Sequence, residues 1–143
     1  MAAGNDNSDA SNDSPARVQQ AITVGASTIK DAKADFSNFG APVDIWAPGL
    51  NIISTWNDGK TKMISGTSMA TPHVAGFAAY LLGLDSSLTP AQVAKLIDEK
   101  SLKNVLSGVR EFFFSMLPVR PPDAESALLV APGTVNKLLN NGL

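Results

Sequence analysis

The stretch Gly66-Thr-Ser-Met-Ala-Thr-Pro-His-Val-Ala-Gly76 leads from a loop into a helix and places Ser68 at the junction. From here to position 82 the sequence is rich in Ala, Leu and Gly. Its apolar residues recur at spacings of three and four: Val74, Phe77, Ala78, Leu81 and Leu82. This spacing predicts a helix with one buried face. Because the first turn of a helix tolerates proline, Pro72 predicts that the helix begins close to Ser68.

Ser68 has the surroundings that a nucleophilic serine needs. Small neighbours let a substrate approach the hydroxyl, and the free N–H groups of a helix N-terminus favour a developing oxyanion. A Gly-x-Ser-x-Ala sequence is also typical of a serine that only caps a helix. The one histidine of the sequence, His73, follows five residues later. Five steps of about 100° turn its side chain about 140° away from Ser68, so we expect a structural role for His73 and no general base from it.

Strand-like segments precede this helix, and a second helix follows it. The runs at 21–26, 43–46, 51–56 and 62–65 are separated by turn signals, and Asn57-Asp58-Gly59 predicts a hairpin between the last two. Thr89, Pro90 and Gln92 form the N-cap, first position and capping box of a helix. Its apolar stripe comprises Val93, Leu96 and Ile97. A last short helical pattern spans Thr134 to Leu139.

Composition excludes several classes of protein. The 143 residues are 44% hydrophobic and 17% charged, which is too apolar for a disordered chain. A net charge of −2 argues against a nucleic-acid-binding protein. No apolar run is long enough to cross a bilayer, and the N-terminal residues do not resemble a signal peptide. The absence of cysteine excludes disulfides, thiolate metal sites and cysteine nucleophiles.

Four motifs resemble those of one enzyme family, in the same order and at similar spacing. They are the Gly66–Gly76 stretch, Ala2-Ala-Gly-Asn-Asp-Asn7, Phe36-Ser-Asn-Phe-Gly40 and Asp44-Ile-Trp-Ala-Pro-Gly49. Together they resemble subtilisin-like serine proteases, and most of all the secreted fungal proteinase K-like enzymes. The resemblance runs from Ala2 to about Val109 and resumes at Pro132. It implies an α/β fold, namely the C-terminal part of a three-layer domain with a mainly parallel sheet flanked by helices, incomplete as a domain.

The resemblance also implies roles for individual residues. Ser68 would be the nucleophile, and the Asn5 side-chain amide would bind the oxyanion beside the backbone N–H of Ser68. Ala2, Ala3 and Gly4 would form one wall of the pocket for the residue before the cut bond. The substrates would be proteins or peptides, and the protein would be secreted, with no nucleic-acid or membrane partner.

A calcium ion is the one cofactor that the resemblance implies. Asp44 matches a calcium-binding carboxylate, and the backbone carbonyls of Gln19 and Ala21 would be its co-ligands. An isolated Asp after a strand is also a common turn or cap residue. Both interpretations of Asp44 therefore stay open at this point.

The sequence departs from the family in what it lacks. The family carries its catalytic Asp and His before the oxyanion Asn, and this sequence begins four residues before Asn5. We therefore expect no useful protease activity from this chain alone and doubt that it folds independently. Two alternatives remain: a truncated, non-catalytic product, or a binding module that keeps only the scaffold.

Residues 110–131 interrupt the family pattern and divide the chain. Residues 1–109 correspond to the C-terminal portion of a catalytic domain, and residues 132–143 to its tail. Between them, three prolines stand beside a dense apolar cluster with neither strand nor helix period. Removing the segment joins Ser-Gly-Val to Pro-Gly-Thr in a continuous family-like tail, which suggests a translated intron.

Overall fold

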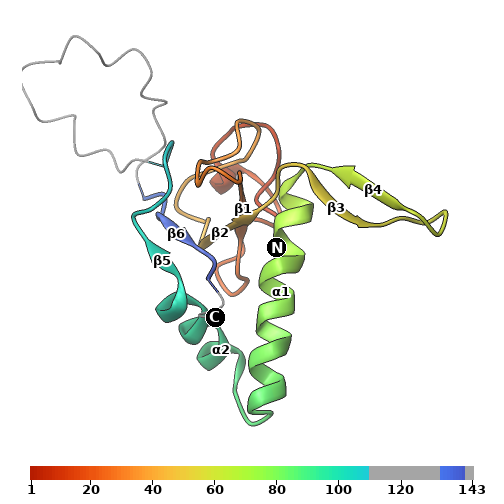
Figure 1. Cartoon of the computed structure of the whole chain (residues 1–143). Coiled ribbons are helices and arrows are strands. Elements are labelled where there is room, and N and C mark those ends of the chain that lie inside the picture. Colours follow the sequence, from red (N-terminus) through yellow and green to blue (C-terminus); the bar gives the residue numbers. More distant parts are fainter. Residues whose placement is uncertain (110–132, 141–143) are drawn as a thin grey trace, which may run out of the picture.

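The computed structural model describes residues 1–109 and 133–140 (Figure 1). The predicted insert at 110–131, with Pro132 and residues 141–143, lies outside this part of the chain. The order of elements is η1 (Ala10–Asn12), β1 (Val24–Ser27), β2 (Ile45–Pro48), β3 (Ile52–Thr55), β4 (Thr61–Ile64), α1 (Thr67–Leu84), α2 (Pro90–Lys100), β5 (Leu102–Lys103) and β6 (Lys137–Leu138). The four strands predicted before the first helix are therefore confirmed, with boundaries shifted by one to three residues.

The main sheet has the strand order β1-β2-β6-β5. β1, β2 and β6 run parallel, and only β5 is antiparallel to its neighbour. Val24 lies opposite Ile45, and Trp46 lies opposite Leu138. The sheet is therefore mainly parallel, as expected, and its third strand comes from the far end of the chain.

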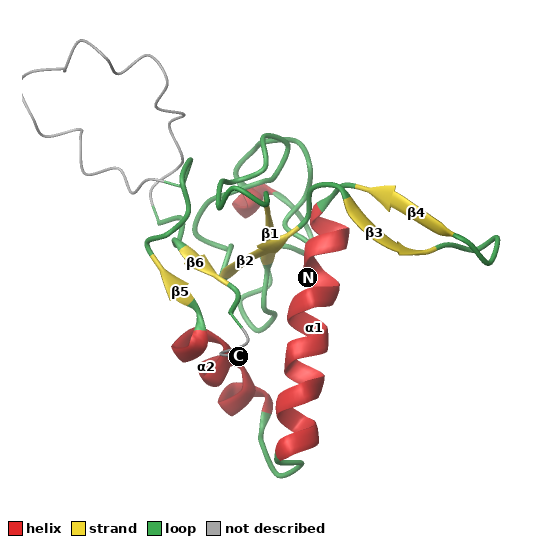
Figure 2. Cartoon of the chain, in the orientation of Figure 1, coloured by secondary structure: helices red, strands yellow, loops and turns green. Residues whose placement is uncertain are grey.

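Both helices pack on the same face of this sheet (Figure 2). Ile45 and Ala47 of β2 share one core with Val74 and Phe77 of α1 and with Ile97 of α2. α2 begins as predicted, with Thr89 as N-cap, Pro90 in the first turn and a complete capping box to Gln92. The alternation of side chains along β2 sends Ile45 and Ala47 to the helices and Trp46 to the other side.

Loops cover the opposite face of the sheet in the described part of the chain. Trp46 is fully buried there, and its indole N–H donates to the Val135 carbonyl at 2.8 Å. Around it packs a second core that contains no residue of α1 or α2: Ala3, Ala10, Ala16, Val43, Leu106, Val109 and Leu138. The helices therefore supply one layer of the fold, and the N-terminal and C-terminal loops supply the other.

The predicted hairpin forms and extends away from the rest of the fold (Figure 1). β3 and β4 pair antiparallel, with Ile53 opposite Met63. The turn closes with Gly59 at φ +78°, a left-handed conformation that glycine adopts without strain. β4 then leads directly into the N-terminus of α1.

Two details of α1 differ from expectation. The helix begins at Thr67, close to the expected start, so Pro72 lies beyond the first turn. Because proline has no N–H, the Ser68 carbonyl receives no helix hydrogen bond from position 72. Leu82 is 40% exposed, whereas Leu81 is buried. Leu82 stands above exposed Ala75 and Ala79 on the outer face, because residues three, four and seven apart share a helix face.

The predicted helix at 134–139 is wrong, because these residues form β6 and its flanking loops. The Leu139 N–H donates to the Trp46 carbonyl, and the Asn104 N–H donates to the Asn136 carbonyl. A helix of six residues is only marginally stable without tertiary contacts. The hydrogen bonds that these residues make to β2 and β5 therefore outweigh their local preference for a helix.

Among the described helices, none combines the length and apolar character that spanning a membrane requires.

Candidate active site

Ser68 is the second residue of α1, and its side chain is exposed to solvent. Gly66 precedes the helix with φ 156° and ψ 160°, a region of backbone conformation that is essentially restricted to glycine. Its N–H donates to the Gly49 carbonyl at 2.8 Å, which anchors the turn after β4 to the end of β2. Within the described residues, neither the N–H nor the hydroxyl of Ser68 has a hydrogen-bond partner. Both groups are therefore free to act on a ligand.

Asn5 reaches the same helix N-terminus from the beginning of the chain. The backbone N–H and the hydroxyl of Thr67 both donate to Asn5 Oδ1, each at 2.9 Å. These bonds use the amide oxygen and fix which way the amide faces. Asn5 Nδ2 makes no hydrogen bond to any described residue, so its two donors stay available.

The nitrogens of the two free donors lie close to one position beside Gly66, which the Met69 sulfur also borders. A Cβ atom built on Gly66 would lie 3.6 Å from Asn5 Nδ2 and 3.7 Å from the Ser68 amide nitrogen. Because glycine has no Cβ, this space stays open. A neutral side-chain N–H and a backbone N–H that converge next to an exposed serine hydroxyl form an arrangement that can stabilise an oxyanion.

The three residues before Asn5 run alongside β1. Ala2 forms a parallel bridge with Val24, and the Ala3 N–H donates to the Val24 carbonyl at 3.0 Å. Ala3 is fully buried, while Ala2 and Gly4 are half-buried. Ala3 therefore presents no accessible surface in this structure, whereas Ala2 and Gly4 present part of theirs. Gly4 ties the segment to α1, since its N–H donates to Thr67 Oγ1 at 3.2 Å.

Thr67 is a functional neighbour that sequence reasoning missed. It is fully buried, accepts from the Gly4 N–H and donates twice to Asn5. In the sequence it counted only as a small residue next to the serine. No sequence signal could have found it, because its hydrogen bonds to Asn5 join residues 62 positions apart.

His73 points back along its own helix. Its Nδ1 lies 2.9 Å from the Met69 carbonyl oxygen, and because a carbonyl only accepts, Nδ1 carries the proton of this bond. This contact agrees with the structural role expected for His73. Among the described residues, no side chain is hydrogen-bonded to Ser68 in the manner of a general base.

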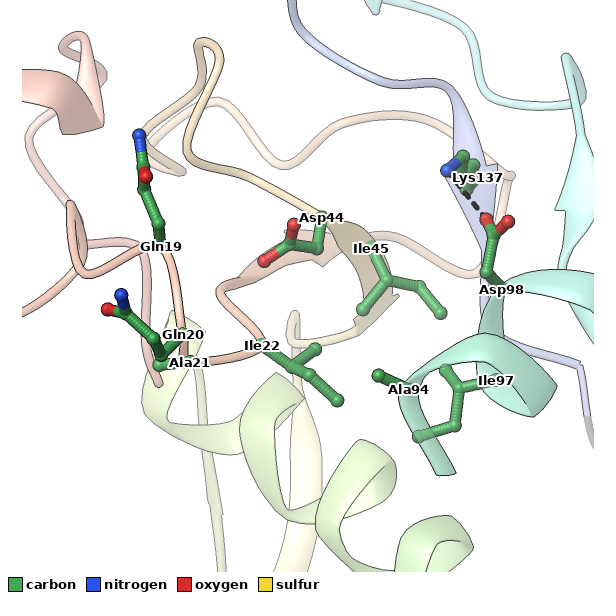
Figure 3. Close-up of a pocket in the computed structure, with 10 residues that line it drawn as sticks. All are labelled: Gln19, Gln20, Ala21, Ile22, Asp44, Ile45, Ala94, Ile97, Asp98 and Lys137. Carbon is green, nitrogen blue, oxygen red and sulfur yellow. Dashed lines mark ion pairs between the residues drawn. The ribbon is translucent and has the colours of Figure 1, made fainter. Parts of the chain in front are cut away.

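The three residues proposed as calcium ligands lie around one pocket of about 200 Å³ (Figure 3). The Asp44 carboxylate points toward the segment that carries Gln19 and Ala21. Its Oδ2 accepts from the Thr23 N–H at 2.7 Å. Desolvation raises the pKa of Asp44, and the Thr23 bond opposes the rise. Within the described chain, Oδ1 of Asp44 and the carbonyl oxygens of Gln19 and Ala21 make no hydrogen bond.

An ion-pair cluster borders the other end of this pocket. Lys137 Nζ lies 2.6 Å and Lys103 Nζ 2.8 Å from Asp98 Oδ1. Hydrogen bonds from Lys103 and Lys137 lower the pKa of Asp98. The described residues hold no group of three or more His, Cys, Asp or Glu side chains that could bind a metal. A cation in the pocket would therefore depend on Asp44 and on carbonyl oxygens.

Comparison with known proteins places the chain in a family. The profile described as "Subtilase family" matches residues 1–127. The chain is 58% identical over 109 residues to the cuticle-degrading protease of Metarhizium anisopliae, covering 76% of this chain and 28% of that protein. It is 46% identical over 142 residues to proteinase T of Parengyodontium album, covering 99% of this chain and 41% of proteinase T.

A solved structure, of a cold adapted subtilisin-like serine proteinase, superposes with a TM-score of 0.81 at 45% identity. It covers 98% of this chain, which in turn spans 43% of that proteinase. The chain thus spans less than half the length of each relative named here. The match over residues 1–127 and the superposition agree with the predicted α/β fold. The chain belongs to the subtilase family of subtilisin-like serine proteases.

Proposed function

We propose that residues 1–109 carry the nucleophile and the oxyanion site of a serine endopeptidase. Ser68 is the nucleophile, and Asn5 Nδ2 and the Ser68 backbone N–H bind the oxyanion. The observation that carries the proposal is the convergence of these two donors on the open space beside Gly66. Ala2, Ala3 and Gly4 form a wall of the adjoining substrate pocket.

The chemistry follows from the placement of these groups. Ser68 Oγ attacks the carbonyl carbon of the scissile peptide bond, and the carbonyl oxygen takes the negative charge. Fixed donors that meet this charge lower the barrier, because they bind the tetrahedral intermediate more tightly than the planar substrate. The intermediate then expels the amine, which leaves with the proton that Ser68 lost, and an acyl group stays on Ser68. Water hydrolyses this ester, which releases the carboxylic acid and restores the serine hydroxyl.

The Ser68 proton needs an acceptor, and none of the described residues places one beside it. Serine is a weak nucleophile without an adjacent base. In subtilisin itself, loss of the histidine lowers turnover about 2 × 10⁶-fold, and we take that magnitude over from subtilisin. We therefore propose that the 143-residue chain alone does not hydrolyse peptides measurably.

We further propose a calcium ion at the Asp44 pocket. Carboxylate and carbonyl oxygens are the donors that Ca²⁺ prefers, and the free oxygens of Asp44, Gln19 and Ala21 fit this chemistry. The ion would have a structural role and join the segment before β1 to the start of β2. Proteins or peptides would be the substrates, and the protein would be secreted.

A hybrid enzyme tests the catalytic proposal. In this hybrid the 142 aligned residues of proteinase T are replaced by the 143-residue chain. The retained part of proteinase T is expected to supply the Asp and His that the family pattern places before Asn5. We expect hydrolysis of a chromogenic peptide, its complete loss in Ser68→Ala, and a kcat lower by about 10²–10³-fold in Asn5→Ala, a range taken from subtilisin.

The control is Asn57→Ala, in the exposed hairpin turn, which should retain full activity. Labelling of Ser68 by an organophosphonate should occur in the hybrid and not in the isolated chain. A folded hybrid that hydrolyses peptide equally well with Ala at position 68 would contradict the proposal. A folded but inactive hybrid would favour the non-catalytic alternatives.

A further inference from the structure

The Phe36–Gly40 motif contains a buried asparagine to which the catalytic proposal gives no role. Asn38 is fully buried, and its hydrogen bonds surround Asn5. Its backbone N–H donates to the Gly4 carbonyl at 2.9 Å. Its Oδ1 accepts from the N–H groups of Asp6 at 2.9 Å and Ser8 at 3.1 Å. Asn38 thereby holds the main chain on both sides of Asn5.

The orientation of the Asn38 amide is set by its partners. Two N–H donors face its oxygen, and its Nδ2 donates to Asp13 Oδ2 at 2.7 Å. A flipped amide would direct N–H groups at the N–H groups of Asp6 and Ser8 and would leave the Asp13 carboxylate without its donor. The bond to Asp13 is charge-assisted, which strengthens this preference.

Gly4 allows Asn38 to come this close. A Cβ atom on Gly4 would lie 2.3 Å from Asn38 Nδ2, and Gly4 has φ +108°. The segment that carries Asn5 is also bonded at Asn7. The Asn7 N–H donates to the Phe36 carbonyl, and Lys33 Nζ donates to Asn7 Oδ1. The segment that carries Asn5 is therefore bonded to residues 33–39 along its length.

We propose that Asn38, oriented by Asp13, is the positioning residue for the oxyanion donor Asn5. It touches neither substrate nor the reacting atoms, and it acts by fixing the backbone at positions 4, 6 and 8. This proposal rests on the proposed function of Asn5. A donor displaced by about 1 Å stabilises the transition state poorly, at a cost of up to about 10²-fold in rate.

Exchanging the side chains of Asn38 and Asp13 in the hybrid enzyme tests the proposal. Asn38→Asp brings two carboxylates together and should lower kcat by about 10- to 10²-fold with little change in KM. Asp13→Asn keeps an amide oxygen as acceptor and should have a small effect. The double variant reverses donor and acceptor, since Asn at position 13 can donate to Asp at position 38, and should restore kcat.

A double-mutant cycle separates positioning from general destabilisation. If Asn38 acts through Asn5, Asn38→Asp should cause no further loss of kcat once Asn5→Ala is present. Additive losses, or failure of the exchange to restore kcat, would overturn the proposal. Asp58→Asn, which neutralises an exposed carboxylate in the hairpin turn and keeps an oxygen to accept from the Lys60 N–H, is the matched control.

Two further measurements distinguish failure of the Asn38 proposal from misfolding of a variant and from failure of the proposed function. Where Asn38→Asp does not fold, Asp13→Ala removes only the acceptor and should lower kcat by a smaller factor; unchanged kcat would overturn the proposal. In the ¹⁵N-labelled hybrid enzyme, Asp13→Ala should shift the Asn5 side-chain and Ser68 amide resonances, and unchanged resonances would overturn the proposal. An Asn5→Ala hybrid with normal kcat would instead refute the proposed function, whatever Asn38 does.

Discussion

Gly66 shows how one missing side chain shapes the candidate site. Its backbone occupies a region that other residues avoid, and its missing Cβ leaves open a position close to the two proposed oxyanion donors. Gly66 therefore has two roles: it permits the backbone turn before α1, and it leaves room for a ligand beside the donors.

Gly66→Ala is expected to affect both stability and turnover. The alanine Cβ would be strained at φ 156°, at a cost of about 1–3 kcal/mol, and would narrow the space that the oxyanion enters. In the hybrid, thermal melting should shift down and kcat should fall. Gly76→Ala is the control, because a Cβ there meets nothing within 4 Å. Equal kcat in the two variants would contradict this account of Gly66.

Sequence predicted some residues of the site and not others, for a physical reason. Ser68 stands in a local pattern, at a loop-to-helix junction, that can be read from the sequence. Its proximity to Asn5 came from resemblance alone, because no periodicity relates residues so far apart. Thr67 and Asn38 matter through buried hydrogen bonds to distant backbone, which leave no mark on composition or spacing.

At the scale of elements, α2 depends on its N-terminal cap. Thr89 Oγ1 accepts from the Gln92 N–H, and Gln92 Oε1 accepts from the Thr89 N–H. Thr89→Ala should lower the free energy of unfolding by about 1 kcal/mol, measured by denaturant titration of the hybrid. Thr89→Ser keeps the hydroxyl and should be close to neutral. A loss in Thr89→Ser as large as in Thr89→Ala would show that the cap is not the cause.

Asp98 links the C-terminal end of α2 to β5 and β6 through Lys103 and Lys137. These hydrogen bonds hold the pKa of Asp98 below its ordinary value of 3.8. Because the folded-state pKa is lowered, this contribution to stability is present above pH 3.8 and is lost as the pH falls through the folded value. The difference in urea midpoint between the parent hybrid and Asp98→Asn should therefore be largest near neutral pH and shrink below pH 3.8. A difference independent of pH would contradict the role of this carboxylate.

The elements that sequence predicted well are those with strong local signals. The cap of α2 and the Asn57–Gly59 turn are examples, because capping residues and turn glycines act within a few positions. β6 was predicted as a helix, since its pairing with Trp46 in β2 is a contact with a distant strand. The helix or strand preference of residues 134–139 carries no information about a contact with a strand so distant in the sequence.

At the scale of the whole molecule, the segments on either side of residues 110–132 are already joined. Asn136 Nδ2 donates to the Leu106 carbonyl at 2.8 Å and to the Val109 carbonyl at 3.1 Å. Residues 132–135 would then suffice to connect Val109 to Asn136. This geometry supports the proposal that residues 110–131 are an insert in one continuous domain.

Deletion of residues 110–131 is therefore expected to leave the fold intact. A shorter connection lowers the entropy cost of loop closure, so the hybrid should melt at the same or a higher temperature, with a gain of up to about 1–2 kcal/mol. Activity toward the chromogenic peptide should be retained. Loss of cooperative melting after the deletion would show that these residues belong to the domain. A spliced message that retains these codons would separately refute an intronic origin.

The position of β6 between β2 and β5 constrains when this protein can acquire its structure. During synthesis, residues 137 and 138 emerge from the ribosome after the other strands that the structure describes, yet they occupy an interior place in the sheet. Until they arrive, β2 exposes an unpaired edge, and such edges associate with other chains. We therefore expect the nascent polypeptide to be prone to aggregate through this edge until β6 is inserted.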